Sequence, residues 1–488
     1  MQEALLKNIE SLEALSAQLE PNEVQRSELL QKVQAYAQTY LEALPQRKAY
    51  IGDLPASDLS IQESPRSIEE ILQLYQEEVA EKGIRASSPG HFGYIPGGGV
   101  YTSALGDYLV DVTNEYAGMY FASPGAVTIE HQVIDWTKKI FGFPQTAAGN
   151  ITSGGSIANL TALTVARDQH QIKGTKIEQS VIYTSAHLHH CVTKSLRIIG
   201  LGDIIIRQIA LDEKHRLQVE SLQEQLAKDK EAGLTPFMVI ASAGTTNTGA
   251  IDPLKVLGHI CQEEGMWYHV DAAYGGYFIL VDTLKPLFEG IEMADSLVVD
   301  PHKGLFIPYG AGIVLVKHGQ ALAQSMSEYA DYMQDANQGS LSLNPADLSP
   351  ELSKHFRGLR IWLPLQLHGI APFRACLEEK RYLLTYFRER IQEMGFRVGP
   401  EPDLSVSYFW FPYEGPEIHA YNAALHRLML ADGTSFFSTT HIEDTFVIRV
   451  AIVSFRTKKV HVDRAVDMIA ACKVQLDQQW TPRLHSHS

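Results

Sequence analysis

A lysine and an aspartate near the middle of the chain have the surroundings expected of a carbonyl-cofactor site. Lys303 stands in Asp300-Pro301-His302-Lys303-Gly304, between the apolar runs 297–299 and 305–307. An unpaired ammonium is costly there, so we expect a buried lysine with a lowered pKa, which suits it to form an imine. Asp271, in His-Val-Asp-Ala-Ala at 269–273, would supply the counter-charge for a heterocyclic nitrogen.

A glycine-rich turn before a helical pattern would complete such a site. Thr-Ser-Gly-Gly-Ser at 152–156 precedes an amphipathic stretch that starts at Ile157. Glycines let backbone N–H groups approach an anion, and the helix N-terminus adds its dipole. The turn has neither the Gly-Lys-Ser/Thr end of a Walker loop nor the GxGxxG pattern of dinucleotide folds. Alone it could be an ordinary turn with an N-cap; together with Asp271 and Lys303 it predicts a phosphorylated aldehyde cofactor.

Three histidines and a cysteine at 187–191 raise the alternative of a metal site. His187, His189, His190 and Cys191 follow a predicted strand, and no carboxylate with ligand spacing accompanies them. Only alternate side chains face one way at a strand end. We therefore predict no metal, and expect one of these imidazoles to stack on a flat cofactor.

Length, charge and cysteine usage restrict the class of protein. The chain has 488 residues, a net charge of −16 and four cysteines without CxxC spacing. This charge disfavours a nucleic-acid or anionic-membrane partner, and scattered thiols fit a reducing cytoplasm. No stretch reaches eighteen apolar residues, and the acidic first fifteen residues do not form a signal peptide. A cytoplasmic globular protein of about two to four domains is expected.

Short apolar runs that alternate with helical patterns predict an α/β fold with a mostly parallel sheet covered by helices. The predicted domains are an N-terminal helical arm (1–85), a large α/β domain (86–365) and a small α+β domain (366–488). In the arm, apolar stripes either pack on the chain's own body or are exchanged between protomers. Residues 318–352 are expected to form a long loop. The predicted strands of the large domain are 180–184, 203–208, 237–242, 266–270, 296–299 and 312–316, and its predicted helices are 157–171, 221–230 and 253–264.

These motifs together resemble the group II pyridoxal-phosphate (PLP) decarboxylases, and most of all the aromatic-L-amino-acid decarboxylases. The resemblance extends from about residue 70 to 470, and includes Ala122-Ser123-Pro124, Phe356-Arg357-Gly358-Leu359 and Ile448-Arg449-Val450-Ala451. It implies a fold-type I, PLP-dependent transferase-like architecture. It also implies a homodimer with exchanged N-terminal arms and sites at the interface.

The resemblance also implies a role for individual residues. Lys303 matches the lysine that holds PLP through a Schiff base, and Asp271 matches the carboxylate that keeps the pyridine nitrogen protonated. His189 matches the histidine stacked on the ring, and Arg449 the arginine that receives the substrate carboxylate. Arg357 is a second basic residue of the family's site. The remaining cofactor contacts implied are Thr246 and Ala273 at the ring, and Gly154, Gly155, Ser156 and Asp300 at the phosphate, with His302 beside it.

The reaction implied is decarboxylation of an L-amino acid, preferably aromatic, to the amine and CO2. Tyr332 aligns with the loop tyrosine that returns a proton, and Tyr329 competes for that role. Departures fall at Ile157, at Gly304 and in the expected substrate pocket at Tyr94, Pro96 and Gly118, where they could leave room for a bulkier side chain. The alternatives are an acidic or aliphatic substrate, aldehyde-synthase or lyase chemistry, and an inactive PLP-binding relative.

Overall fold

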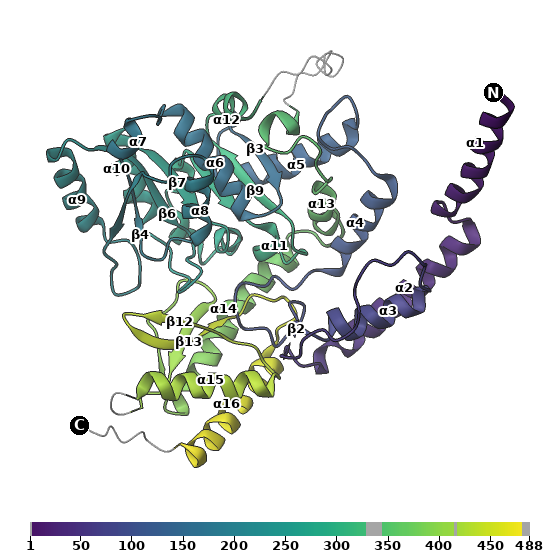
Figure 1. Cartoon of the computed structure of the whole chain (residues 1–488). Coiled ribbons are helices and arrows are strands. Elements are labelled where there is room, and N and C mark those ends of the chain that lie inside the picture. Colours follow the sequence, from purple (N-terminus) through teal and green to yellow (C-terminus); the bar gives the residue numbers. More distant parts are fainter. Residues whose placement is uncertain (1, 328–343, 414–416, 481–488) are drawn as a thin grey trace, which may run out of the picture.

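A computed structural model describes residues 2–327, 344–413 and 417–480 of the chain (Figure 1). A large domain with a central sheet lies above a smaller domain in this view, and the N-terminal helices extend away from both. None of the described helices is long and apolar enough to cross a membrane.

A seven-stranded sheet forms the centre of the large domain, in the order β3-β9-β8-β7-β6-β4-β5. Strands β4 to β8 are parallel to their neighbours, whereas β9 is antiparallel to both β8 and β3. The mostly parallel sheet and the six predicted strands are confirmed. The strands are β3 (Ala148–Thr152), β4 (Ser180–Ser185), β5 (Ile205–Ile209), β6 (Thr235–Ser242), β7 (Trp267–Asp271), β8 (Ser296–Val299) and β9 (Gly312–Val316).

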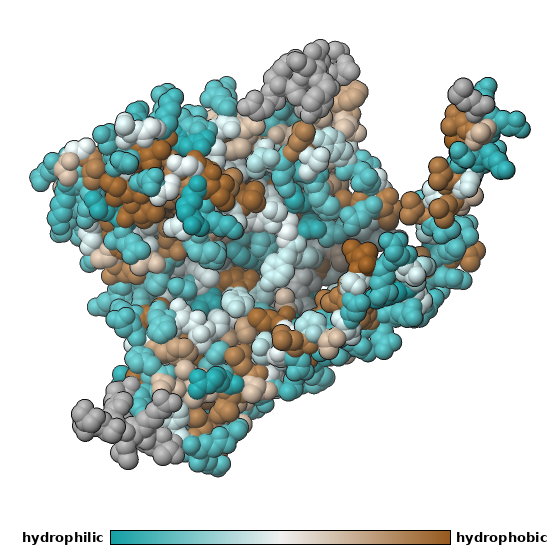
Figure 2. All heavy atoms as spheres, viewed as in Figure 1, coloured by the Kyte–Doolittle hydropathy of each residue, from teal (hydrophilic) through white to brown (hydrophobic). Residues whose placement is uncertain are grey.

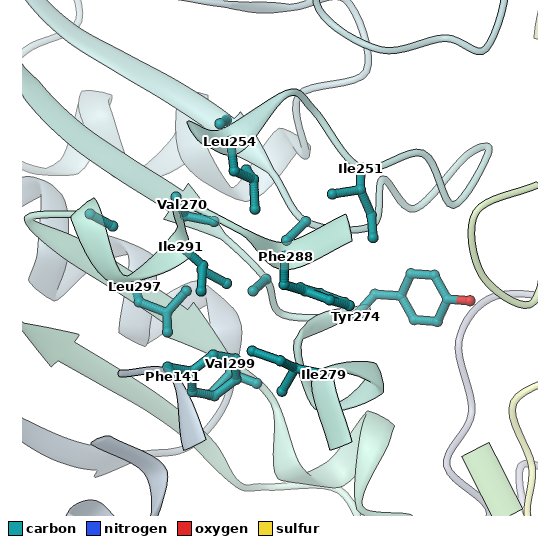
Figure 3. Close-up of a cluster of buried hydrophobic side chains, with 14 of the residues drawn as sticks. Phe141, Ile251, Leu254, Val270, Tyr274, Ile279, Phe288, Ile291, Leu297 and Val299 are labelled. Carbon is teal, nitrogen blue, oxygen red and sulfur yellow. The ribbon is translucent and has the colours of Figure 1, made fainter. Parts of the chain in front are cut away.

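Two apolar layers cover the sheet because successive side chains of a strand point to opposite faces. On one face, Val270 of β7 and Leu297 of β8 pack with Phe141, Phe288 and Ile291 (Figure 3). On the other face, Trp267 and Val298 pack with α6 and α8. Helices with buried residues on the first face are α5 (Pro124–Ile140), α9 (Val219–Glu231) and α10 (Leu254–Glu264); those on the second are α6 (Gly155–Gln169), α8 (His190–Ile198) and α12 (Gly319–Met326).

Several elements of the large domain were not predicted. Strand β3 contains Gly149 and Asn150, residues that are depleted in strands, and only its pairing with β9 fixes it. Helix α12 lies inside the segment 318–352 that was expected to be a loop, so that prediction is wrong for Gly319–Met326. Also unpredicted were α4 (Tyr101–Thr113), α5, the short α7 (Lys176–Gln179) and the short α11 (Pro301–Gly304). Helix α13 (Gly358–His368) packs against α4 and α5.

The small domain begins with the long helix α14 (Ala371–Glu393) and contains a four-stranded antiparallel sheet, as predicted for an α+β domain. The sheet order is β10-β11-β13-β12. The strands are β10 (Arg397–Val398), β11 (Val406–Trp410), β12 (Ser438–Ile442) and β13 (Thr445–Ala451), and the other helices are α15 (Ile418–Asp432) and α16 (Lys459–Gln479). The sequence had not indicated α15 or β12.

The glycine-rich segment 86–99 leads from the arm to α4 of the large domain, contains no helix or strand, as predicted, and is hydrogen-bonded to the small domain on the way. Phe92 donates its backbone N–H to Phe436 O (2.8 Å) and accepts from Ala451 N at its own carbonyl (2.7 Å). These bonds join the segment to the end of β13 and to the residues before β12, and bring the backbone of Tyr94 next to Arg449.

The N-terminal arm consists of α1 (Gln2–Ser16), α2 (Glu23–Ala43) and α3 (Ile68–Tyr75), and β1 (Tyr50–Ile51) pairs with β2 (Gly83–Ile84) at its base. Ser67 and Glu70 form the predicted capping box of α3. The apolar stripe of α1 does not pack on the chain's own body, because Leu5 is 58% and Leu19 87% exposed. Figure 2 shows these apolar side chains in brown along the arm.

Candidate functional site

All the residues that the sequence predicted as cofactor contacts line one cavity of about 310 Å³. The cavity lies beyond the carboxyl ends of β6, β7 and β8, where ligands of open α/β sheets bind. Its volume is at the lower end of the range for small-molecule sites. The predicted residues that meet there are Gly154, Gly155, Ser156, His189, Thr246, Asp271, Ala273, Asp300, His302 and Lys303.

Lys303 reaches the cavity from the single helical turn α11, directly after β8. Its Nζ lies 2.8 Å from Asp300 Oδ2. Burial lowers the pKa of Lys303, but the charge of Asp300, its hydrogen bond and the charge of Asp271 outweigh burial, so the pKa is raised. The expected lowering of the Lys303 pKa is therefore wrong, because the lysine is buried beside carboxylates that its sequence neighbours did not reveal.

Asp300 does not have the chemistry of a phosphate contact, although it lies next to the glycine cradle. One carboxylate oxygen pairs with Lys303, and the other, Oδ1, is buried without a hydrogen-bond partner among the described residues. An ionised carboxylate can only accept hydrogen bonds, as can a phosphate oxygen. The prediction that Asp300 holds the phosphate is not supported, and its contact identifies it as the partner of the Lys303 ammonium.

The glycine cradle has the geometry of an anion site at the N-terminus of α6. Gly154 adopts φ +152°, which favours glycine, and a Cβ on Gly155 would lie 2.8 Å from Asp300 Oδ2. The first N–H groups of a helix have no partner inside it, and here those of Gly155 and Ser156 belong to residues that line the cavity. This end of the cavity therefore fits a phosphate group.

Asp271 ends β7 and receives two hydrogen bonds from the protein. Its Oδ1 accepts from Ala273 N (3.0 Å), and its Oδ2 accepts from Asn159 Nδ2 (3.3 Å). Hydrogen bonds to a carboxylate favour its ionised form. An oriented anion facing the cavity fits a protonated pyridine nitrogen.

His189 is the N-cap of α8, and its Nδ1 accepts from Cys191 N (3.2 Å). Burial lowers the pKa of His189 further below neutrality, so the imidazole is uncharged with its proton on Nε2. A neutral ring on the cavity wall fits stacking on a flat cofactor. Within the ranges that the structure describes, no group of three or more His, Cys, Asp or Glu side chains could hold a metal ion.

Arg449 is a buried cation whose hydrogen-bond partners are all neutral. Its Nη1 and Nη2 each donate to Tyr94 O (3.2 Å), Nε donates to Asn247 O (3.3 Å), and Nη1 also donates to Ser438 Oγ (3.1 Å). Burial lowers the pKa of Arg449 to about 10. Among residues 2–327, 344–413 and 417–480, no carboxylate lies close enough to the Arg449 guanidinium, that is within 4.0 Å, to form an ion pair. Such a charge attracts an anionic ligand.

None of the predicted substrate contacts, Arg449 included, belongs to the wall of this cavity. Arg357 forms a two-pronged ion pair with Glu351 (2.8 and 3.0 Å). Tyr94 is 57% exposed, whereas Pro96 is buried. The space beside Gly118 is filled by Tyr116, whose ring would lie 2.7 Å from a Cβ, so this glycine does not by itself leave room for a bulkier substrate. Tyr332 and Tyr329 lie outside the described residues.

The structure also explains one departure from the family pattern and adds residues to the site. A Cβ on Gly304 would lie 2.8 Å from the Tyr277 Cβ, so no aromatic side chain fits there. Asn159 faces the cavity because it follows Ser156 by about one helical turn. The helical spacing of these two residues in the sequence could have predicted this contact. The remaining unpredicted lining residues are Ser153, Ile157, His187, Cys191, Ser242, Gly244, Thr245, Tyr274, Tyr309 and Gly310.

Acid should destabilise the chain because buried histidines have to be protonated on unfolding. Burial lowers the pKa of His91 and of His269 to about 4, from about 6.5. The unfolded state therefore binds more protons as pH falls from 6.5 to 4, and the free energy of unfolding should fall by several kcal/mol. Asp252 acts in the opposite direction, because burial raises its pKa to about 6, but it is one group against three, since burial also lowers the pKa of His187 to about 4.

Urea unfolding followed by fluorescence at pH 7, 6, 5 and 4.5 measures this dependence. His91→Gln should flatten the curve below pH 6. An unfolding free energy that is constant or rises on acidification over this window would contradict the assignment.

The mostly parallel sheet, the anion cradle, Lys303 and the Asp271 carboxylate together define a PLP enzyme of fold-type I. PLP offers a phosphate, a pyridine nitrogen and a carbonyl carbon, and the cavity presents a partner for each.

Comparisons with known proteins extend this assignment to a family. The model of the pyridoxal-dependent decarboxylase conserved domain matches residues 52–411. The chain is 33% identical to an aromatic-L-amino-acid decarboxylase of Bacillus atrophaeus over 86% of this chain and 88% of that protein. It is 28% identical to a phenylacetaldehyde synthase of Arabidopsis thaliana over 84% and 87%.

The chain belongs to the pyridoxal-dependent decarboxylase family and is a PLP-dependent amino acid decarboxylase, a carboxy-lyase. Its fold is that of Catharanthus roseus tryptophan decarboxylase, solved in complex with L-tryptophan. The TM-score is 0.85 at 22% identity, over 94% of this chain and 99% of that one.

Proposed function

We propose that the substrate is an aromatic L-amino acid whose α-carboxylate binds to Arg449. The observation that carries this proposal is the buried Arg449 cation close to the cofactor cavity, whose partners in the described part of the chain are all neutral. Tyr274, which lines the cavity, is close enough to Arg449 to influence the pKa of the guanidinium. An arginine in this position would bind the carboxylate of an amino acid while its nitrogen reaches the region of Lys303.

The aromatic preference rests on two supports. A relative that shares a third of its residues with this chain is named an aromatic-L-amino-acid decarboxylase. In addition, aromatic rings gather next to Arg449, where Tyr94 and Phe436 lie 5.6 Å apart between centroids and His91 contacts both. A ring cluster of this kind suits an apolar, flat side chain better than an acidic one.

Each residue of the site then has a task that follows from its chemistry. PLP, when bound, supplies a carbonyl for the substrate amine and a ring that takes up the electron pair left when CO2 departs. Lys303 provides the amine that anchors the cofactor, and Asp271 holds a proton on the ring nitrogen. Gly155 and Ser156 donate N–H groups to the phosphate, and His189 covers one ring face. Arg449 orients the carboxylate for release, and Tyr332 returns the proton to carbon.

Two different outcomes compete with simple decarboxylation. The similarity to a phenylacetaldehyde synthase keeps aldehyde formation open, and the same cofactor site could serve an acidic or aliphatic amino acid. The tyrosine at position 332 favours proton return, and hence the amine, over oxidation.

Product analysis with PLP-loaded protein tests the proposal. L-tryptophan, L-tyrosine and L-phenylalanine should each give CO2 and amine in equal amounts, without O2 uptake or ammonia release. L-glutamate and L-leucine should react at least about tenfold more slowly, the usual discrimination of an apolar pocket. Aldehyde with ammonia, or faster turnover of L-glutamate, would overturn the proposal.

We also propose that the chain works as a cytoplasmic homodimer. Helix α4 exposes Tyr101, Leu105, Tyr108, Leu109 and Val112, and the stripe of α1 is uncovered as well. Exposed apolar surface on this scale is typical of an interface, and a second copy would cover it if the arms were exchanged. The four cysteines are free thiols, which suits a reducing compartment.

A further inference from the structure

Five side chains form a buried row of hydrogen bonds that ends on Asp271. Trp267 Nε1 donates to Ser296 Oγ (2.8 Å), and Ser296 Oγ bonds His269 Nδ1 (2.8 Å). His269 Nε2 bonds Asn159 Oδ1 (2.8 Å), and Asn159 Nδ2 donates to Asp271 Oδ2 (3.3 Å). Trp267, His269 and Asp271 are alternate residues of β7, and therefore face the same side of the sheet as α6, which carries Asn159.

The chemistry of the two end groups sets the direction of every bond in this row. An indole N–H only donates, so the Ser296 oxygen accepts from Trp267, and the Ser296 proton remains available for His269 Nδ1. A carboxylate only accepts, so the amide N of Asn159 faces Asp271 and its amide oxygen faces His269. The Asp271 end therefore requires a proton on His269 Nε2, and a neutral ring then accepts the Ser296 proton at Nδ1.

The interior of the row is shielded from solvent. His269, Asn159 and Ser296 have no exposed surface, and Trp267 is almost fully buried. A flipped Asn159 would place its oxygen against the Asp271 carboxylate, and a doubly protonated His269 would need a charge in the core. Burial lowers the pKa of His269 to about 4, in agreement with the neutral ring. The bonds thus point in one direction, from Trp267 to Asp271.

We propose that His269 and Asn159 are positioning residues that hold the Asp271 carboxylate turned towards the cofactor ring nitrogen. Donated hydrogen bonds stabilise the charged form of a carboxylate, and each donor in a row polarises the next. Asp271 Oδ1 is already held by Ala273 N, so the Asn159 bond decides the rotation of the carboxylate about its last torsion. This inference rests on the proposed role of Asp271 at the ring nitrogen.

Cofactor binding and its pH dependence test the row without any need for turnover. Asn159→Leu should weaken PLP binding by about ten- to a hundredfold, because a hydrogen bond to a charged group is lost. The pH midpoint of the absorbance change of bound PLP should shift as well. His269→Gln keeps a donor towards Asn159 and should give a smaller effect than Asn159→Leu in both measurements.

A matched control comes from the next residue of the same strand. Tyr268 lies on the opposite face of β7, and its buried hydroxyl donates to Leu254 O (2.9 Å). Tyr268→Phe also removes one buried hydrogen bond. It should lower the free energy of unfolding but leave the PLP dissociation constant and the pH midpoint unchanged.

A double-mutant cycle then separates this inference from the proposed role of Asp271. In an Asp271→Asn background, Asn159→Leu should no longer change PLP affinity, because the group on which it acts is altered. If Asn159→Leu weakens binding equally in both backgrounds, or if Tyr268→Phe shifts the midpoint to the same extent, the positioning role is wrong. If Asp271→Asn itself binds PLP with an unchanged pH midpoint, the role of Asp271 fails instead. Should Asn159→Leu not fold, Ser296→Ala and His269→Gln carry the same comparison.

Discussion

Lys303→Ala will lower kcat by at least about 10³-fold, in the range found when a group that acts directly in the chemistry is removed. The variant will also fail to retain PLP covalently. Lys303 is the lysine whose amine lines the cofactor cavity, and its Nζ is held 2.8 Å from Asp300 at the end of β8. Alanine leaves the cradle and Asp271 in place, so PLP should still bind, only more weakly and reversibly.

Borohydride treatment followed by gel filtration and peptide mass spectrometry measures covalent retention. In the unaltered protein the label should appear on the peptide that contains residue 303. Lys317→Met provides the control, because Lys317 is also half-buried and follows the neighbouring strand β9, where its Nζ donates to Met293 O (3.2 Å). Covalent label on Lys303→Ala protein, or its loss from Lys317→Met protein, would show that the wrong lysine has been chosen.

Arg449→Leu will raise KM for the amino acid by about a hundredfold or more, while PLP affinity changes little. Removing one member of a buried charge pair costs about 2–5 kcal/mol, and here the pair forms only when the substrate carboxylate arrives. Arg449 has no carboxylate partner among the described residues, so its removal leaves no protein charge unpaired. The fold should therefore tolerate the change better than it tolerates the loss of other buried arginines.

Arg388→Met is the matched control for a buried arginine of the same domain. Arg388 donates to Ser407 Oγ (2.6 Å) and to Pro400 O (3.0 Å), and pairs with Glu401 (3.3 Å). The Arg388→Met substitution should lower the melting temperature of the protein without changing KM for the amino acid. Arg449→Lys should recover part of the affinity, since it restores the charge but not the forked donors. An unchanged KM in Arg449→Leu would exclude this arginine as the carboxylate contact.

The large sheet and the cofactor contacts were accessible from the sequence because the signals are local. Strands buried on both faces give continuous apolar runs, and β8 was predicted with its observed bounds, Ser296–Val299. In a parallel sheet the residues that follow successive strands gather at one edge, so Asp271 and Lys303 could be expected to meet. Gly154 and Gly155 could also be assigned to the cofactor site, because a glycine pair before a helix is typical of an anion site.

The arm and the helices around α4 were harder to predict from the sequence, because the residues that they contact are distant in the chain. The apolar stripe of α1 could be predicted from the sequence. No local signal, however, shows that this stripe lies away from the rest of the chain. The short strand β3 has little intrinsic preference for its conformation and depends on pairing with β9, more than 150 residues later in the chain. Gly118 likewise suggested open space, and only the packed structure shows that Tyr116 fills it.

The sequence by itself determined which cofactor the chain holds and which residues line one cavity, because those residues lie at strand ends and in one glycine turn. The tertiary structure alone decided how the residues are charged and oriented. Lys303 keeps a raised pKa because Asp300 lies within 2.8 Å, and Arg449, enclosed by β13 and the segment at Tyr94, has no counter-anion among the described residues. The row that ends on Asp271 joins Asn159 to residues more than 100 positions away. Electrostatic interactions depend on distance and burial, and the folded chain sets both.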